Sequence, residues 1–191
     1  MSRLIKAAGP LELRDPLPDG FAALVRSIMY QQLAGAAAST IHGRFLELFA
    51  DGLSPAAVLA LPEGIMRTAG VSGSKAAAIT DLARKVDDGT VPLHDVESLS
   101  DDELVARLVQ VRGIGRWTAE MFLMFQLRRL DVWPVDDYGV RKGWALAHQL
   151  KDLPAPRALQ AEGDLFKPYR TVAAWYCWRA VDTVLPNTRG Q

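Results

Sequence analysis

The stretch "VRGIGRWTAEMFLMF", residues 111–125, decides the fold of this chain. Two glycines, Gly113 and Gly115, flank one isoleucine, and helical patterns precede and follow them. Gly113 can take a positive φ, and Gly115 carries no Cβ that would obstruct the approach of another backbone. The tripeptide therefore predicts a tight turn between a helix that ends near Val109 and a helix that begins near Arg116.

The start of the second helix also offers a place for an anion. Its first N–H groups lack an acceptor within the helix, and the helix dipole makes that end partly positive. A nucleic-acid phosphate suits this geometry, and Arg112, Arg116 and Thr118 can add side-chain donors. A tight corner without a ligand is the alternative. A dinucleotide fingerprint and a P-loop are excluded, because no strand precedes the glycines and no Gly-Lys-Ser/Thr follows.

The rest of the chain carries helical patterns and almost no strand signals. Apolar residues recur every three or four positions from Phe21 to Met29, and a second stripe runs from Ala38 to Leu48. Ser54 followed by Pro55, and the capping box that begins at Ser100, indicate helix starts. We therefore expect an all-α protein of about ten helices.

The amino-acid composition excludes several classes of site and of protein. The 22 basic residues equal the 22 acidic ones, so any contact with nucleic acid must come from locally clustered groups. Cys177 is the single cysteine, which excludes a disulfide framework, a zinc cluster or a four-cysteine iron–sulfur site built by one chain. No apolar run approaches the roughly 20 residues of a membrane helix, and no signal-peptide core is present at the N-terminus. We therefore expect a cytoplasmic protein without a membrane partner.

Segments in a fixed order carry a resemblance to a known family. They are "FAALVRSIMYQQLAGAAASTIHGRF" from Phe21, "GVSGSKAAAITDLA" from Gly70, "LVQVRGIGRWTAEMF" from Leu108 with "VWPVDDYGVRKGW" from Val132, and "KPYRTVAAWYCWR" from Lys167. Together they resemble the helix–hairpin–helix (HhH-GPD) DNA glycosylase superfamily and, within it, the 3-methyladenine DNA glycosylase II branch. The resemblance covers residues 21–179, nearly the whole chain.

The resemblance implies a fold and a reaction. The fold is all-α with two helical lobes, residues 20–129 with the hairpin and residues 1–19 plus 130–191 with the catalytic aspartate, and the active site lies in the cleft between them. The reaction is the hydrolysis of the N-glycosidic bond of alkylated purines, such as 3-methyladenine and 7-methylguanine, in base excision repair. The implied partner is double-stranded DNA with damaged bases, bound by a monomer that is associated with the bacterial nucleoid.

The resemblance also assigns catalytic roles. Asp137 matches the family's essential aspartate, whose carboxylate stabilises the oxocarbenium-like sugar and orients the attacking water. Asp137 also occupies an N-cap position, a role compatible with catalysis, and Asp136 is the alternative acid. Trp117 stands where strand-nicking relatives carry a lysine nucleophile. The resemblance therefore implies a monofunctional enzyme without AP lyase activity.

Aromatic side chains are expected to form the base pocket, because a cationic alkylpurine is attracted to an aromatic face. The aromatic candidates are Trp117, Trp175, Trp178 and Tyr30, and Met121 is expected to line the same pocket. Core packing is the alternative for the tryptophans of the closing helix. Met121 stands where some relatives have a tyrosine, so the range of substrates can differ.

The target base must leave the helical stack before it can react. The family fills the vacated position with a wedge, a side chain from the corner "YQQLAG", for which Gln32 and Leu33 are the candidates. Gln31 is expected to contact DNA beside the wedge. Gly73 and Lys75 are expected to hold a second phosphate, with a solvated lysine as the alternative.

No cofactor is expected for catalysis, and no iron–sulfur cluster. The family hairpin commonly binds a monovalent cation, Na⁺ or K⁺, through main-chain carbonyls, which here belong to Val109, Val111 and Ile114. Two alternatives of another class are open. One is a non-catalytic helix–hairpin–helix module that only binds DNA, and the other is a helical scaffold that binds protein.

Overall fold

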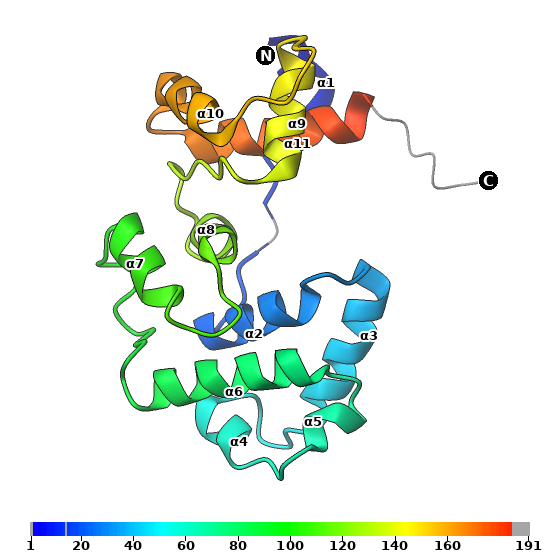
Figure 1. The fold of residues 1–191 in the computed structure, drawn as a ribbon, viewed down its shortest axis with the longest axis vertical. Coiled ribbons are helices and arrows are strands. Elements are labelled where there is room, and N and C mark those ends of the chain that lie inside the picture. The colour runs from blue at the N-terminus through cyan, green and yellow to red at the C-terminus, as the bar shows by residue number, and fades with distance from the viewer. Residues whose placement is uncertain (1, 14, 185–191) are drawn as a thin grey trace, which may run out of the picture. The chain divides into compact units, whose positions relative to one another are not determined.

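A computed structural model of the chain describes residues 2–13 and 15–184. These residues form eleven α-helices, one 3₁₀ helix and no strand, which confirms the all-α prediction (Figure 1). The elements are α1 (Ser2–Ala8), α2 (Gly20–Tyr30), α3 (Gly35–Leu46), α4 (Pro55–Leu59), α5 (Ile65–Thr68), α6 (Gly73–Asp87), α7 (Asp101–Leu108), α8 (Arg116–Phe125), α9 (Tyr138–Ala147), α10 (Pro156–Gly163), η1 (Asp164–Phe166) and α11 (Arg170–Val184). Within the described ranges, none of the helices has the length and apolarity to cross a membrane.

The chain divides into two compact units, residues 16–122 and residues 1–15 with 123–191. We placed these boundaries near residues 19 and 129 from the sequence. Helix α8 begins in the first unit, and its last residues, 123–125, belong to the second. The expected position of an active site between two lobes stays a prediction.

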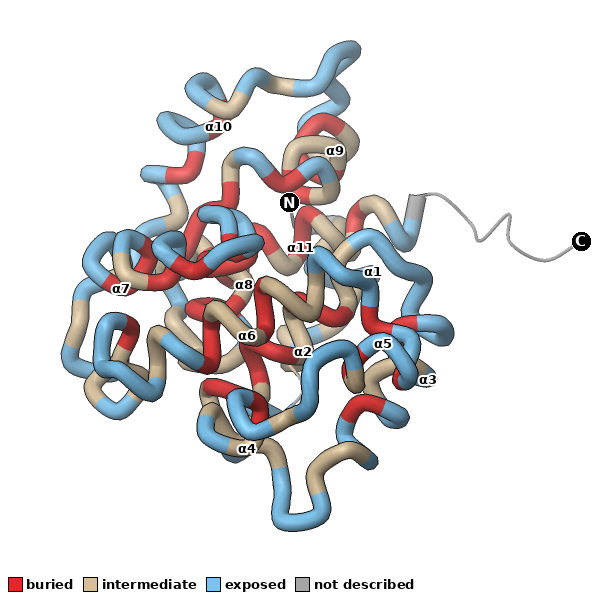
Figure 2. The backbone as a smooth tube through the Cα atoms, turned by 60° about the horizontal axis from the view of Figure 1, so that its bottom comes forward, coloured by how far each residue is buried: buried red, intermediate tan, exposed pale blue. Residues whose placement is uncertain are grey.

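In the unit of residues 16–122, α6 is the helix on which other helices pack. Both α2 and α4 lie against α6, and α3 lies against α2 (Figure 1). The buried residues of α6, Ala78, Ile79, Leu82 and Ala83, recur at the spacing of one helix face, so α6 presents that face to the core (Figure 2). Burial of this face fixes α6 against the end of α2, where the predicted wedge begins.

The helix starts follow local side-chain chemistry. Glu103 Oε2 accepts a hydrogen bond from Ser100 N at 2.9 Å, and Ser100 Oγ accepts one from Glu103 N at 3.3 Å, which confirms the predicted capping box of α7. Ser54 caps α4 with Pro55 in its first turn, as predicted. Each cap satisfies amides that the helix itself leaves without an acceptor.

In the unit of residues 1–15 and 123–191, α9 and α1 pack against α11. The crossing of α9 and α11 requires a glycine, because a Cβ at Gly143 would lie 1.8 Å from the carbonyl oxygen of Cys177. Thr171 at the start of α11 accepts a hydrogen bond from Val132 N at 3.0 Å and donates one to Arg129 O at 2.7 Å. These contacts hold the segment that leads into α9 against α11.

Candidate active site and DNA-binding loops

Asp137 is the N-cap residue of α9 and is buried, with 9% of its surface exposed. Its Oδ1 accepts one hydrogen bond from Val140 N at 2.7 Å and another from Trp178 Nε1 at 2.8 Å. Asp136, the alternative acid, is exposed. The fold therefore orients the carboxylate of Asp137 through both its own helix and α11, and the N-cap role expected from the sequence is present.

A glycine gives Trp178 its access to this carboxylate. A Cβ at Gly139 would lie 2.6 Å from Cδ1 of Trp178 and 3.1 Å from Oδ1 of Asp137. The sequence prediction named Trp178 but missed Gly139. The available signal was a glycine in the first turn of a helix, a residue that costs about 1 kcal/mol relative to alanine in a helix interior.

Cys177 lies next to this site and is fully buried. Burial, together with the negative charge of Asp137, raises the pKa of Cys177 to about 12. The thiol is therefore protonated at neutral pH and has the character of a small apolar core residue.

The two tryptophans of α11 have different surroundings. The ring of Trp178 packs against Phe125, with 5.8 Å between centroids, and donates to Asp137. The ring of Trp175 meets Tyr176 edge-on at 5.0 Å, and the guanidinium carbon of Arg179 lies 5.4 Å from its centroid. The contacts of Trp178 therefore place it beside the predicted catalytic group, whereas those of Trp175 are with its helix neighbours.

A pocket of about 470 Å³ lies in the unit of residues 16–122. It is lined by Arg26, Ser27, Tyr30, Gln31, Gln32, Trp117, Thr118 and Met121. The pocket thus contains Tyr30, Trp117 and Met121 from the set predicted to hold the base. Trp117 is 45% exposed, so its indole ring is accessible for stacking.

Arg26, which the sequence prediction missed, is one of the residues that line this pocket. The guanidinium carbon of Arg26 lies 4.3 Å from the centroid of the Tyr30 ring, and the ring of His42 meets Tyr30 edge-on at 6.0 Å. Burial and, to a lesser extent, the charge of Arg26 lower the pKa of His42 below its usual value, so this imidazole is neutral at pH 7. The phenol ring of Tyr30 therefore already has a cationic neighbour.

The hairpin has the geometry expected of it. Gly113 has a φ of +77°, and Ile114 N donates to Val111 O at 3.1 Å. A Cβ at Gly115 would meet no atom within 4 Å, and among the described residues the amides of Gly113 and Gly115 have no hydrogen-bond acceptor. Arg112 is exposed beside them. The phosphate contact stays a prediction, as does the monovalent cation at the carbonyls of Val109, Val111 and Ile114.

Arg116 and Thr118 follow the hairpin on α8. Arg116 Nε donates to the buried Glu120 Oε1 at 2.9 Å, and Thr118 is itself buried. The hydroxyl of Thr118 accepts a hydrogen bond from Gln31 Nε2 at 3.3 Å. Both side chains predicted to contact DNA thus also take part in contacts within this unit.

The corner after α2 presents the predicted wedge residues at the surface. Gln32 is exposed with a φ of +56°, and Leu33 is exposed as well. Gln31 Nε2 donates to Gly113 O at 3.0 Å, in addition to its bond with Thr118. The corner and the hairpin are therefore in direct contact.

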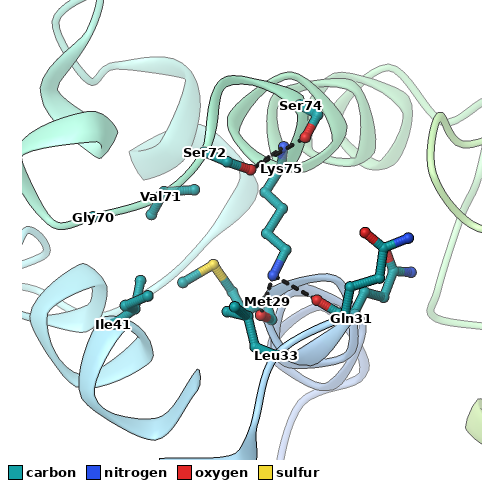
Figure 3. A pocket seen from close by; sticks show the side chains of 10 residues that line it. Met29, Gln31, Leu33, Ile41, Gly70, Val71, Ser72, Ser74 and Lys75 are labelled. Carbon is teal, nitrogen blue, oxygen red and sulfur yellow. Dashed lines mark hydrogen bonds between the residues drawn. The ribbon is translucent and has the colours of Figure 1, made fainter. Parts of the chain in front are cut away.

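Lys75 makes contacts that we did not expect. Its Nζ donates to Met29 O at 2.7 Å and to Gln31 O at 2.8 Å (Figure 3). We predicted a phosphate contact, with a solvated lysine as the alternative. The phosphate contact stays a prediction, and the ammonium has two main-chain acceptors. Its neighbour Gly73 opens α6, where a Cβ would lie 3.0 Å from a terminal nitrogen of Arg67.

Comparison with known proteins finds relatives over most of the chain. Residues 25–168 match the family described as "HhH-GPD superfamily base excision DNA repair protein". The chain is 35% identical over 186 residues to DNA-3-methyladenine glycosylase 1 of Schizosaccharomyces pombe, covering 93% of this chain and 80% of that protein. It is 30% identical over 166 residues to the putative DNA-3-methyladenine glycosylase YfjP of Bacillus subtilis, covering 83% of this chain and 58% of that protein.

Solved structures agree with this match. The DNA-3-methyladenine glycosidase of Bacillus halodurans superposes with a TM-score of 0.88 at 35% identity, covering 96% of this chain and 84% of that chain. The 3-methyladenine DNA glycosylase of Schizosaccharomyces pombe, in complex with abasic DNA, superposes with a TM-score of 0.81 at 34% identity. These two chains align with 96% and 93% of the present chain, so the similarity extends over both units.

Proposed function

Because this chain belongs to the HhH-GPD superfamily of base excision DNA repair proteins, we propose that it is a DNA glycosylase that removes alkylated purines from double-stranded DNA. Relatives at 35% and 30% identity that bear the name DNA-3-methyladenine glycosylase support this substrate class. One observation of the site carries the proposal. A buried carboxylate, Asp137, stands in the family's motif and is held by two hydrogen-bond donors.

Asp137 is the proposed catalytic residue. As the bond between C1′ and the base nitrogen breaks, its electron pair leaves with the base and positive charge develops on the sugar. The negative carboxylate stabilises that charge, and a water molecule then adds to C1′, loses a proton and leaves an abasic site. Because Val140 N and Trp178 Nε1 already hold Oδ1, the carboxylate needs little reorganisation when the substrate arrives.

The pocket beside Trp117 is the proposed binding site for the displaced base. Its volume of about 470 Å³ lies within the range of small-molecule sites. The exposed indole of Trp117 offers a face on which a cationic purine can stack, and Met121 supplies an apolar contact.

The reaction that we propose is monofunctional and uses water. An indole cannot act as the amine nucleophile that strand-nicking relatives use, and Trp117 occupies that position of the motif. The tryptophan at this position of the motif supports a reaction that ends at the abasic site.

Incubation with duplexes that each carry one defined lesion tests the reaction. The lesions are 3-methyladenine, 7-methylguanine, hypoxanthine, ethenoadenine and an N1-methylated base. We expect alkali-labile sites at one or more of these lesions and no strand breaks before the alkali step. Breaks without alkali would overturn the monofunctional assignment, and the absence of alkali-labile sites at every lesion would overturn the glycosylase assignment.

We further propose that the protein acts as a monomer in the cytoplasm, where it meets its DNA substrate. The solved structure of a relative with abasic DNA supports a DNA partner. Light scattering on the purified chain is expected to give one species of 20.9 kDa. A stable dimer at micromolar concentration would contradict the monomer.

A further inference from the structure

We infer that Lys75 is a positioning residue for base displacement: its ammonium holds the turn that carries the wedge, and α6 sets the place of that turn relative to the hairpin. The inference rests on the proposed function, because only an enzyme that extrudes its target nucleotide needs a wedge. It extends that function by naming a residue that touches neither the base nor the sugar.

The first contact joins α6 to the end of α2. The side chain of Lys75 extends from the first turn of α6, and its Nζ reaches the carbonyls of Met29 and Gln31 (Figure 3). Carbonyls in the last turn of a helix lack an amide partner within the helix, so an ammonium satisfies them well. Burial lowers the pKa of Lys75, which agrees with a cation that faces the protein.

The residue that follows these carbonyls is held in an uncommon conformation. Gln32 has a φ of +56°, although it is not a glycine. A residue other than glycine is strained in this region and persists there only where its surroundings determine the backbone. The bond from Lys75 to Gln31 O fixes the preceding peptide and thereby directs the exposed Gln32 and Leu33.

The same face of α6 also contacts the hairpin. Lys75, Ala78 and Asp81 are spaced three residues apart and share that face. A Cβ at Gly113 would lie 3.2 Å from Cβ of Ala78, and Arg112 N donates to Asp81 Oδ2 at 2.8 Å. One turn further on, Lys85 Nζ donates to Asp81 and to the carbonyl of Gln110.

Gln31 completes the connection. Its main-chain carbonyl accepts from Lys75, while its side-chain nitrogen donates to Gly113 O at 3.0 Å. A closed set of contacts therefore runs from α6 to the wedge turn, from there to the hairpin, and back to α6 through Asp81. This arrangement holds the wedge at a fixed position relative to the proposed phosphate site at the hairpin. Binding of the DNA backbone and displacement of the base therefore occur together.

Two substrates separate positioning from other roles of Lys75. The substrates are duplexes with 7-methylguanine opposite cytosine and with the same lesion opposite a tetrahydrofuran abasic analogue, where the base has no partner. Lys75→Met should lower the single-turnover rate on the paired lesion by about tenfold and on the unpaired lesion by less than about threefold. Lys75→Arg should stay within about threefold of the wild type on both substrates, because a guanidinium can donate to the same two carbonyls.

A second readout does not depend on base release. In the Asp137→Asn background, 2-aminopurine placed next to the lesion should brighten on binding, and Lys75→Met should reduce this increase. Lys151→Met, a change at an exposed lysine in the other unit, is the matched control for loss of one ammonium.

Three outcomes would contradict the inference. An equal loss of rate on both substrates in Lys75→Met would indicate general destabilisation. An unchanged rate on the paired lesion would show that Lys75 does not position the wedge. A decrease of about 0.9 in the salt dependence of binding would identify Lys75 as a phosphate contact. A wild-type protein that releases no 7-methylguanine from either duplex, but still shows the fluorescence difference, would remove this lesion from the proposed function and leave the inference intact.

Discussion

Trp178 Nε1 lies 2.8 Å from Asp137 Oδ1 and donates a hydrogen bond to it. The donor comes from α11 and the acceptor from the start of α9, two helices that cross at Gly143. The orientation of the carboxylate therefore depends on the packing of these helices. Trp178, expected from the sequence to line the base pocket, is also a positioning group for the proposed catalytic residue.

Replacement of Trp178 by phenylalanine keeps an aromatic ring and removes the donor. A hydrogen bond to a charged group contributes about 1.5–3 kcal/mol, so Trp178→Phe should lower the single-turnover rate constant by about tenfold or more. Binding to abasic DNA and the melting temperature should change little. A Trp178→Phe protein that releases the base at the wild-type rate would show that the ring alone matters.

Gly139→Ala tests the same contact from the other side. The new Cβ would lie 2.6 Å from the indole of Trp178, so the ring must move away from Asp137. We expect a rate loss similar to that of Trp178→Phe, and a double variant that is no slower than either single variant. Gly43→Ala is the matched control, because a Cβ at Gly43 in α3 would meet nothing within 4 Å. If the rate losses of the two single variants multiply in the double variant, Gly139 and Trp178 act independently and the prediction is wrong.

Arg26 should influence which lesion the pocket prefers. Its guanidinium lies over Tyr30 in the proposed base pocket and repels a cationic base. Arg26→Gln should therefore raise the rate on cationic 7-methylguanine relative to neutral hypoxanthine by about threefold to tenfold. Rates on the two lesions, measured with the same flanking sequence, give this ratio. An unchanged ratio would place the base away from Arg26.

Asp81 should make the thermal stability of the unit of residues 16–122 depend on pH. Burial alone would raise the pKa of Asp81, but hydrogen bonds from Arg112 N and Lys85 hold it below its ordinary value of 3.8. A carboxyl whose pKa is lowered on folding stabilises the fold above the unfolded value and loses this effect as pH falls through the folded value. Asp81→Asn should therefore lower the melting temperature by about 2–4 °C at pH 7.

The difference between wild type and Asp81→Asn should shrink as the pH falls below 3.8. Thermal unfolding followed by circular dichroism across this range measures it. Asp51→Asn, at an exposed aspartate, is the control and should show no such trend. A difference that is constant between pH 7 and pH 3 would mean that the charge of Asp81 does not stabilise the hairpin.

Local patterns predicted the parts of the fold that depend on local chemistry. The capping box at Ser100, the positive φ of Gly113 and the N-cap at Asp137 each follow from a few neighbouring residues. The Trp178 contact with Asp137 joins residues 41 positions apart, and Lys75 reaches Met29 across 46 positions. Such contacts arise from helix packing, which no local pattern specifies, so the sequence did not indicate the main-chain contacts of Lys75.

The most direct test of the central claim compares Asp137→Asn with Asp136→Asn, the same change at the exposed neighbour. The measurement is single-turnover release of an alkylated base from duplex DNA, with affinity for abasic DNA measured in parallel. We expect Asp137→Asn to lose about 10²–10³-fold or more in rate while affinity stays within about threefold, and Asp136→Asn to behave as the wild type. Full activity of Asp137→Asn would contradict the proposed mechanism.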